Sequence, residues 1–208
     1  MLRDRIGAGV QVLFVGINPG IRSAAIGHHF AGYSNRFWKL LYDSRLIAEP
    51  IRAEDDARLC EWGFGITNLI ARMTPGIDTL EPHEYPAGLR TLRRKVRRWK
   101  PKVVAFVGVS LYRVIFDKKG PVACGLQEET FEGAGVFVLP NPSGRNANFS
   151  YQQMLAAFRK LRDFHRQASI ITGTNTTRRS APDCCSRPAS STSRSTISSG
   201  TKSRPCSS

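Results

Sequence analysis

The residues best placed to do chemistry stand in three loops, each directly after an apolar run. Residues 16–20 read Gly-Ile-Asn-Pro-Gly and put one neutral asparagine, Asn18, in a turn braced by glycine and proline. A second asparagine, Asn68, lies in the segment 64–69, and residues 141–145 read Asn-Pro-Ser-Gly-Arg. An amide can hold a water molecule by hydrogen bonds, but it is a poor base because it barely accepts a proton.

The sequence lacks the residue spacings of several common kinds of site. Residues 16–23, GINPGIRS, match neither the GxGxxG spacing of dinucleotide-binding proteins nor the GxxxxGK[ST] spacing of a phosphate-binding loop. The five cysteines form no CxxC pair and have no interleaved histidine ligands, and the pair His28-His29 has no further ligand at a suitable spacing. We therefore expect no metal, no organic cofactor and no disulfide framework.

The three loops are positioned by an alternation of strand-like and helix-like segments. Continuous apolar runs are typical of buried parallel strands, and apolar residues three or four positions apart are typical of helices. Strands that alternate with helices predict a mainly parallel sheet with helices on both faces, whose carboxyl ends would bring the three loops together. The predicted strands cover 10–15, 102–107 and 135–139, and a shorter segment at 64–69 runs from a strand into the loop that holds Asn68. The predicted helices cover 34–43 with Ser34 as its cap, 86–100, 110–116 and 151–166.

Charge and composition divide the chain and indicate its partner. The formal net charge is +15 over 208 residues, which favours a polyanion, nucleic acid first and an acidic membrane surface second. Residues 1–172 have the composition of one folded domain, whereas 173–208 are mostly Ser, Thr, Arg and Pro, which predicts a disordered tail. That tail is either an electrostatic arm for DNA or a meaningless extension of the reading frame. No run is long enough to span a bilayer, and the first residues lack the apolar core of a signal peptide.

Four stretches resemble the mismatch-specific uracil/thymine DNA glycosylases, within the uracil-DNA glycosylase superfamily. The resemblance covers about residues 10–166, and it implies a three-layer α/β/α fold with a central, mainly parallel four-stranded sheet. The stretches that carry it are GINPGIRSAAIGHHFAGYSNRFWKLLYDS at 16–44, GFGITNLIARMTPG at 63–76, KPKVVAFVG at 100–108 and VLPNPSGRNANFS at 138–150.

The resemblance also implies roles for residues of the first two loops. Asn18 positions the attacking water where faster uracil glycosylases carry an Asp, and His29 gives support near that water. Gly16 and Ile17 face the flipped pyrimidine with backbone atoms, and Phe30 stacks on it. Asn68 reads the pyrimidine edge, and Ser23 lies at a pocket position that affects tolerance of the thymine methyl group.

The loop Asn141, Pro142, Ser143, Gly144 and Arg145 resembles the one that enters the minor groove and fills the gap left by the flipped nucleotide. Ser143 would bind a phosphate there. A leucine is common at the wedge position in the bacterial pattern, whereas this chain has Arg145. An arginine can fill the gap, stack, and bond the orphaned guanine or a phosphate.

These observations predict a monofunctional DNA glycosylase that removes uracil, or thymine, mispaired with guanine and so initiates base excision repair. The motif loops hold no lysine that could form a Schiff base, so we expect an abasic site without strand cleavage. We expect a monomer that acts on double-stranded DNA, in the cytoplasm and nucleoid of a bacterium or in a nucleus, and away from membranes. Two alternatives stay open: a superfamily glycosylase for another damaged base, and a non-catalytic DNA-binding protein.

Overall fold

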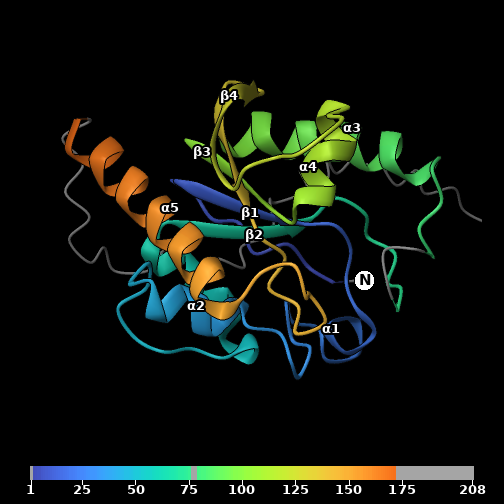
Figure 1. Cartoon of the computed structure of the whole chain (residues 1–208), viewed down its shortest axis with the longest axis horizontal. Coiled ribbons are helices and arrows are strands. Elements are labelled where there is room, and N and C mark those ends of the chain that lie inside the picture. Colours follow the sequence, from blue (N-terminus) through green and yellow to red (C-terminus); the bar gives the residue numbers. More distant parts are fainter. Residues whose placement is uncertain (1, 76–78, 172–208) are drawn as a thin grey trace, which may run out of the picture.

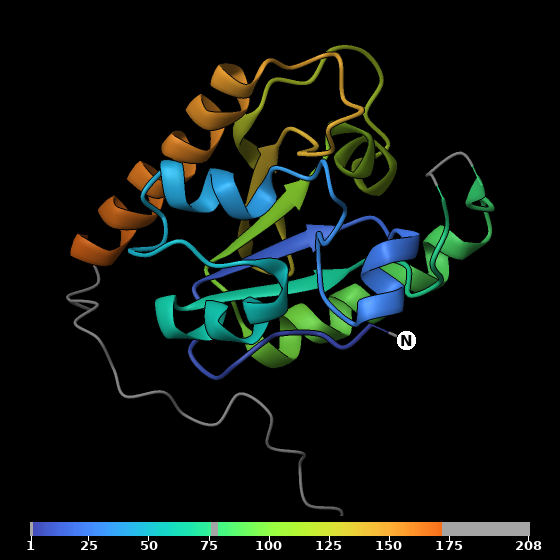
Figure 2. The same cartoon turned by 90° about the horizontal axis from the view of Figure 1, so that it is seen from below.

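The computed structural model describes residues 2–75 and 79–171, and within them a central sheet lies between two layers of helices (Figures 1 and 2). The predicted tail, 173–208, lies outside the described residues. The elements in chain order are β1 Val12–Gly16, α1 Ile21–Ile26, α2 Phe37–Asp43, the 3-10 helix η1 Ala53–Trp62, β2 Phe64–Asn68, α3 Glu84–Trp99, β3 Val103–Val107, α4 Val109–Phe116, β4 Gly125–Phe131, β5 Ala134–Leu139 and α5 Tyr151–Ile171.

The sheet has the strand order β2-β1-β3-β5-β4, and its first four strands are parallel. The α/β/α fold with a mainly parallel sheet is therefore confirmed, and the four predicted strands form its parallel part. A fifth strand, β4, adds an antiparallel edge through a two-residue turn in which Glu132 and Gly133 both have positive φ. The sequence prediction missed β4 because its residues, GLQEETF, are mostly polar and lie at an edge with alternating exposure.

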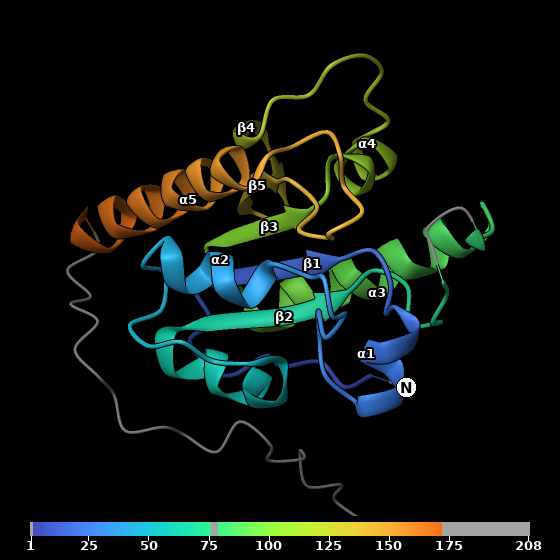
Figure 3. The same ribbon diagram turned by 60° about the horizontal axis from the view of Figure 1, so that its bottom comes forward.

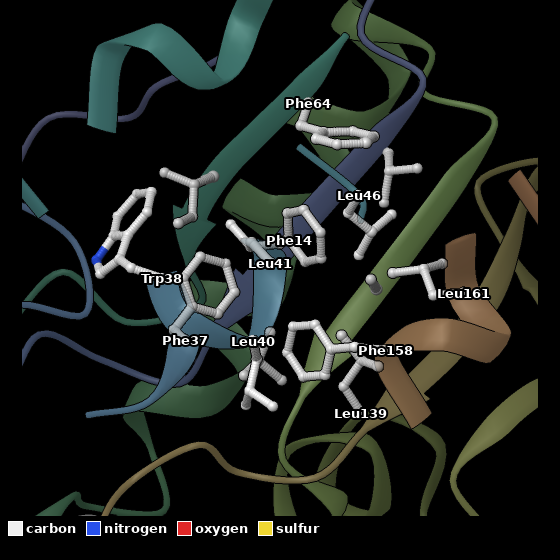
Figure 4. Close-up of a cluster of buried hydrophobic side chains, with 14 of the residues drawn as sticks. Phe14, Phe37, Trp38, Leu40, Leu41, Leu46, Phe64, Leu139, Phe158 and Leu161 are labelled. Atoms are coloured by element: carbon white, nitrogen blue, oxygen red, sulfur yellow. The ribbon is translucent and has the colours of Figure 1, made fainter. Parts of the chain in front are cut away.

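Both faces of the sheet are buried, which explains why the parallel strands β1, β3 and β5 are apolar throughout. Along β1, Val12 and Phe14 pack into one core with α2, η1 and α5, whereas Leu13 and Val15 pack into a second core with α3 and α4. Successive side chains of a strand point to opposite faces, so β1, β3 and β5 each supply both cores, whereas β2 supplies only the first, with Phe64 and Ile66. Figure 4 shows the first core, where Phe14 contacts Phe37 edge to face at 5.3 Å.

The start of α2 differs from its prediction. The helix begins at Phe37, and the backbone N–H of Phe37 donates to Asn35 Oδ1 at 3.0 Å. The expectation that Ser34 caps a helix over 34–43 is therefore wrong. Ser34 instead lies against Gly144: a Cβ atom on Gly144 would stand 2.8 Å from the Ser34 carbonyl oxygen. Because α2 begins three residues later than predicted, Ser34 lies in the preceding loop and contacts a second loop instead of capping the helix.

The helix α3 supports the segment that follows β2 through one close backbone approach. A Cβ atom on Gly88 would stand 2.6 Å from the carbonyl oxygen of Leu69. Alanine could fit only if the helix moved away from this segment. The glycine thus fixes the distance between α3 and the residues directly after Asn68.

Replacement of Gly88 by alanine should therefore destabilise the protein, although the same change at an open helix position stabilises by about 1 kcal/mol. We expect the free energy of unfolding to fall by about 1–3 kcal/mol because of the overpacking. Urea denaturation measures it, with Arg90→Ala on the exposed side of the same helix as control. A Gly88→Ala protein more stable than wild type would show that α3 does not press on Leu69.

Candidate functional site

The carboxyl ends of the parallel strands lie on one side of the molecule, where the segments after β1, β2 and β5 meet (Figure 3). Gly16 at the end of β1 is in register with Asn68 at the end of β2. A Cβ atom on Gly16 would stand 2.5 Å from Asn68 Oδ1 and 3.3 Å from Phe30 Cζ. The structure therefore brings three predicted site residues together, and Gly16 lets the other two approach by having no side chain.

Phe30 has a strained backbone conformation, and its ring stacks on the core. Its φ is +50°, in the left-handed region that residues other than glycine seldom adopt. Its ring stacks on Phe37 with 4.2 Å between centroids and 18° between planes. Strain of about 1–3 kcal/mol persists only where surrounding contacts enforce it. One face of the half-buried Phe30 ring is thus covered by the core, while its edge reaches Gly16.

The side-chain amide of Asn18 is oriented by three oxygen atoms. Nδ2 donates to Thr74 Oγ1 at 2.7 Å, and it also faces the carbonyl oxygens of Pro19 at 3.2 Å and Arg72 at 3.4 Å. Carbonyl oxygens only accept, so this atom must be the amide nitrogen. Within the described residues, Oδ1 of this half-buried side chain accepts no hydrogen bond. The amide can therefore offer that oxygen to an O–H donor such as water.

The segment 69–75 is joined to the GINPG turn by backbone hydrogen bonds. Leu69 N donates to Gly16 O at 2.8 Å, Ile70 N to Ile17 O at 2.8 Å, and Thr74 N to Pro19 O at 3.2 Å. The buried Thr74 thus binds the turn with its backbone and Asn18 with its hydroxyl. Sequence reasoning missed Thr74, and no signal in the sequence identifies this hydroxyl, because the contact spans 56 positions.

A buried carboxylate, Asp56 of η1, holds the segment in front of Phe30. Its Oδ2 accepts the backbone N–H of His29 at 3.0 Å, and its Oδ1 accepts from Arg5 Nε at 2.8 Å and lies 3.2 Å from His28 Nδ1. The carboxylate is fully buried and paired with Arg5, which limits its desolvation cost. The sequence did not reveal this network. Its hydrogen bonds hold the residues directly before Phe30 and so keep the strained backbone of Phe30 in place.

His29 is buried in the same network. Its Nε2 donates to the carbonyl of Arg3 at 2.9 Å, and its own carbonyl accepts from Trp38 Nε1 at 3.1 Å. Burial lowers the pKa of His29 below 6.5, although the Arg3 hydrogen bond and the charge of Asp56 oppose that shift. No hydrogen bond joins His29 to Asn18 in the described part of the chain. The ring is therefore a neutral interior group whose contacts hold the segment before Phe30.

Ser23 and Ile17 are also occupied by structural contacts. Ser23 lies in α1, is buried, and accepts the backbone N–H of Ala31 with its hydroxyl at 3.0 Å. Ile17 is buried in the second core, and its carbonyl accepts from Ile70. Ser23 therefore shapes the loop that carries Phe30, and Ile17 anchors the turn that carries Asn18.

The loop 141–145 is held by a hydrogen bond within it and by hydrogen bonds to the α1–α2 connection and to the segment after β2. Asn141 Oδ1 accepts the Ser143 N–H at 3.0 Å, and Pro142 O accepts the backbone N–H of Arg36 at 2.9 Å. The exposed Arg145 donates from Nη2 to the carbonyl oxygen of Pro75 at 3.0 Å. Pro142, Gly144 and Arg145 thus contact the segments that follow β1 and β2, while Asn141 and Ser143 bind each other within the loop.

The described residues hold no group of three or more His, Cys, Asp or Glu side chains that could bind a metal ion. The same residues include no helix that is both long and apolar enough to cross a membrane.

The site consists of amides, hydroxyls, backbone groups and one aromatic ring, with arginines around it. Such a set binds and orients neutral planar groups and phosphates.

A comparison with protein families agrees with this arrangement. The family model described as the uracil DNA glycosylase superfamily matches residues 4–162. The matched region runs from the segment before β1 into α5, and it includes all three loops of the site.

The lowered pKa of His29 predicts a pH dependence of stability. The unfolded chain binds a proton on this side chain near pH 6.5 while the folded protein resists it, so stability should fall as the pH drops through that value. Urea denaturation between pH 7.5 and 5.5 should show a steeper loss for wild type than for His29→Gln. The exposed His83 supplies the matched control, His83→Gln, with the wild-type slope. Equal slopes for wild type and His29→Gln would contradict this prediction.

Proposed function

The chain belongs to the uracil DNA glycosylase superfamily, whose members are DNA glycosylases, and we propose that it is a monofunctional enzyme that hydrolyses the N-glycosidic bond of uracil mispaired with guanine. Thymine opposite guanine is the second proposed substrate. The observation that carries the proposal is the tethered amide of Asn18: its nitrogen is held by Thr74, and its oxygen accepts no hydrogen bond from the described residues. Asn18 stands two residues after Gly16, where Phe30 and Asn68 converge.

The first step is extrusion of the base from the duplex. An enzyme cannot reach the glycosidic bond of a stacked base, and extrusion costs a few kcal/mol, least for a mispaired base. The Phe30 edge and the Asn68 amide, which converge at Gly16, form the proposed pyrimidine pocket. An amide both donates and accepts, which matches the alternating C=O and N–H groups of uracil and thymine.

Hydrolysis then needs a water molecule beside C1′ of the deoxyribose. We propose that Asn18 Oδ1 accepts a hydrogen bond from this water and aims its oxygen at C1′. The C1′–N1 bond breaks through a state with oxocarbenium character, and its electron pair leaves with the pyrimidine as an anion. The water oxygen forms the new bond to C1′ and its proton passes to solvent. The amide removes no proton, so the reaction should be slow and should depend on a good leaving group.

The other site residues support these steps. We propose that the Arg145 side chain enters the space left by the base, which requires the loss of its hydrogen bond to the Pro75 carbonyl. An exposed hydrogen bond of this kind contributes about 0.5–1.5 kcal/mol, so the Arg145 side chain can reorient on DNA while the other contacts keep the loop in place. His29 and Ser23 act on the pocket through the segment around Phe30, which they hold by hydrogen bonds to the Arg3 carbonyl and from the Ala31 N–H respectively. We propose that the enzyme works as a monomer on double-stranded DNA.

Base release from a panel of duplexes tests the proposal. Single-turnover assays with G·U, G·T, A·U and single-stranded U should give the fastest release from G·U. Asn18→Ala should slow it by at least about 100-fold, because the water loses its position. Binding to a G·U duplex with a non-hydrolysable glycosidic bond should change little. Asn148→Ala removes an exposed asparagine from the loop after β5 and should keep the wild-type rate.

The same panel separates the alternatives. Equal release from all four substrates would contradict mismatch specificity. Release of an oxidised or alkylated pyrimidine, or of hypoxanthine, in preference to uracil would favour another damaged base as substrate. Tight binding of mismatched DNA without release of any base would show a non-catalytic DNA-binding protein.

A further inference from the structure

An exposed tyrosine and an arginine form a fixed pair on the connection between α1 and α2. Tyr33 is 90% exposed, the highest value among the large hydrophobic side chains that the structure describes. The guanidinium carbon of Arg22 lies 3.9 Å from the centre of the Tyr33 ring, and Arg22 Nη1 donates to the Tyr33 hydroxyl at 2.7 Å. The guanidinium group of Arg22 thus orients the Tyr33 ring, although Tyr33 is almost fully exposed to solvent.

The pair is anchored to the loop that carries Phe30. Arg22 Nε donates to the carbonyl of Ala31 at 2.8 Å, and the Ala31 N–H donates to Ser23 Oγ. No carboxylate pairs with Arg22 in the parts of the chain that are described, so its charge is not neutralised there. A fixed, unneutralised cation thus lies beside a fixed aromatic ring.

The pair lies beside the loop proposed to enter DNA. Tyr33 directly precedes Ser34, which presses on Gly144, and Arg36 nearby donates its N–H to Pro142 O. Arg22 lies in the first turn of α1, two residues after the GINPG turn. Figure 3 shows this connection between α1 and α2 on the side where the strands end and beside the segment after β5. The pair therefore belongs to the rim of the proposed pocket.

We propose that Arg22 and Tyr33 form a nucleotide-binding platform for the DNA that flanks the extruded base, and this rests on the proposed function. Arg22 binds a phosphate of that flanking nucleotide, and the Tyr33 ring stacks on its sugar or base. A nucleotide offers both complements at once, an anion for the cation and a flat or apolar group for the ring. The arginine holds the ring in place before binding, so the tyrosine loses little rotational freedom when DNA arrives.

Binding to DNA that has no base to release tests the platform apart from catalysis. The probe is a duplex with a tetrahydrofuran abasic analogue opposite guanine. Tyr33→Ala should weaken the affinity by about 5-fold to 100-fold, the range of one lost stacking contact. Tyr33→Phe keeps the ring and should restore most of that affinity. Tyr42 on α2 is 42% exposed, and Tyr42→Ala is the matched control with wild-type affinity.

Two further readouts locate the contact. Arg22→Gln should lower the slope of log affinity against log salt by about one phosphate contact. 2-Aminopurine on either side of the abasic analogue should be quenched by wild type and less by Tyr33→Ala on the side that stacks. Equal affinities for Tyr33→Ala and Tyr42→Ala, or equal losses for Tyr33→Ala and Tyr33→Phe, would overturn the platform. A protein that binds this duplex through Tyr33 yet releases no base would overturn the proposed catalysis alone.

Discussion

The site depends most on the hydrogen bonds that hold the amide nitrogen of Asn18. Thr74 Oγ1 and the carbonyl oxygens of Pro19 and Arg72 surround that nitrogen. Pro19 belongs to the GINPG turn itself, and Thr74 and Arg72 are available because segment 69–75 is bound along that turn. The close approach of Gly88 to Leu69 in turn supports this segment from α3. The orientation of a single amide is therefore set by β1, β2 and α3 together, and its carbonyl oxygen is the part left for a ligand.

A second set of contacts fixes the other wall of the pocket. Phe30 has an unfavourable backbone conformation, and the segment before it is held by Asp56, the carbonyl of Arg3 and the Trp38 indole. Most of these partners are buried, and Asp56 offsets its own charge with Arg5. The N-terminal residues thus take part in the site without reaching a substrate, because they keep the segment next to Phe30 in place.

The apolar runs predicted the parallel strands well, since strands buried on both faces must be apolar along their whole length. The polar edge strand β4 gave no such signal, and its turn at Glu132-Gly133 was the feature that could have revealed it. The motifs identified Gly16, Phe30 and Asn68, which the structure brings together. Thr74 and Asp56 could not be predicted because each acts on residues far away in the chain. Ser34 illustrates the converse, since a residue suited to capping a helix instead contacts a distant loop.

The surroundings of Asn18 make a direct test possible. A carboxylate is the better base, yet in Asn18→Asp an oxygen would replace Nδ2 and face the carbonyl oxygens of Pro19 and Arg72, which repel it. The decisive measurement is the single-turnover rate of uracil release from a G·U duplex by Asn18→Asp at saturating enzyme. If the turn is built to hold a neutral amide that positions water, the rate falls to that of Asn18→Ala. A rate equal to or above that of the wild type would contradict this role for the amide.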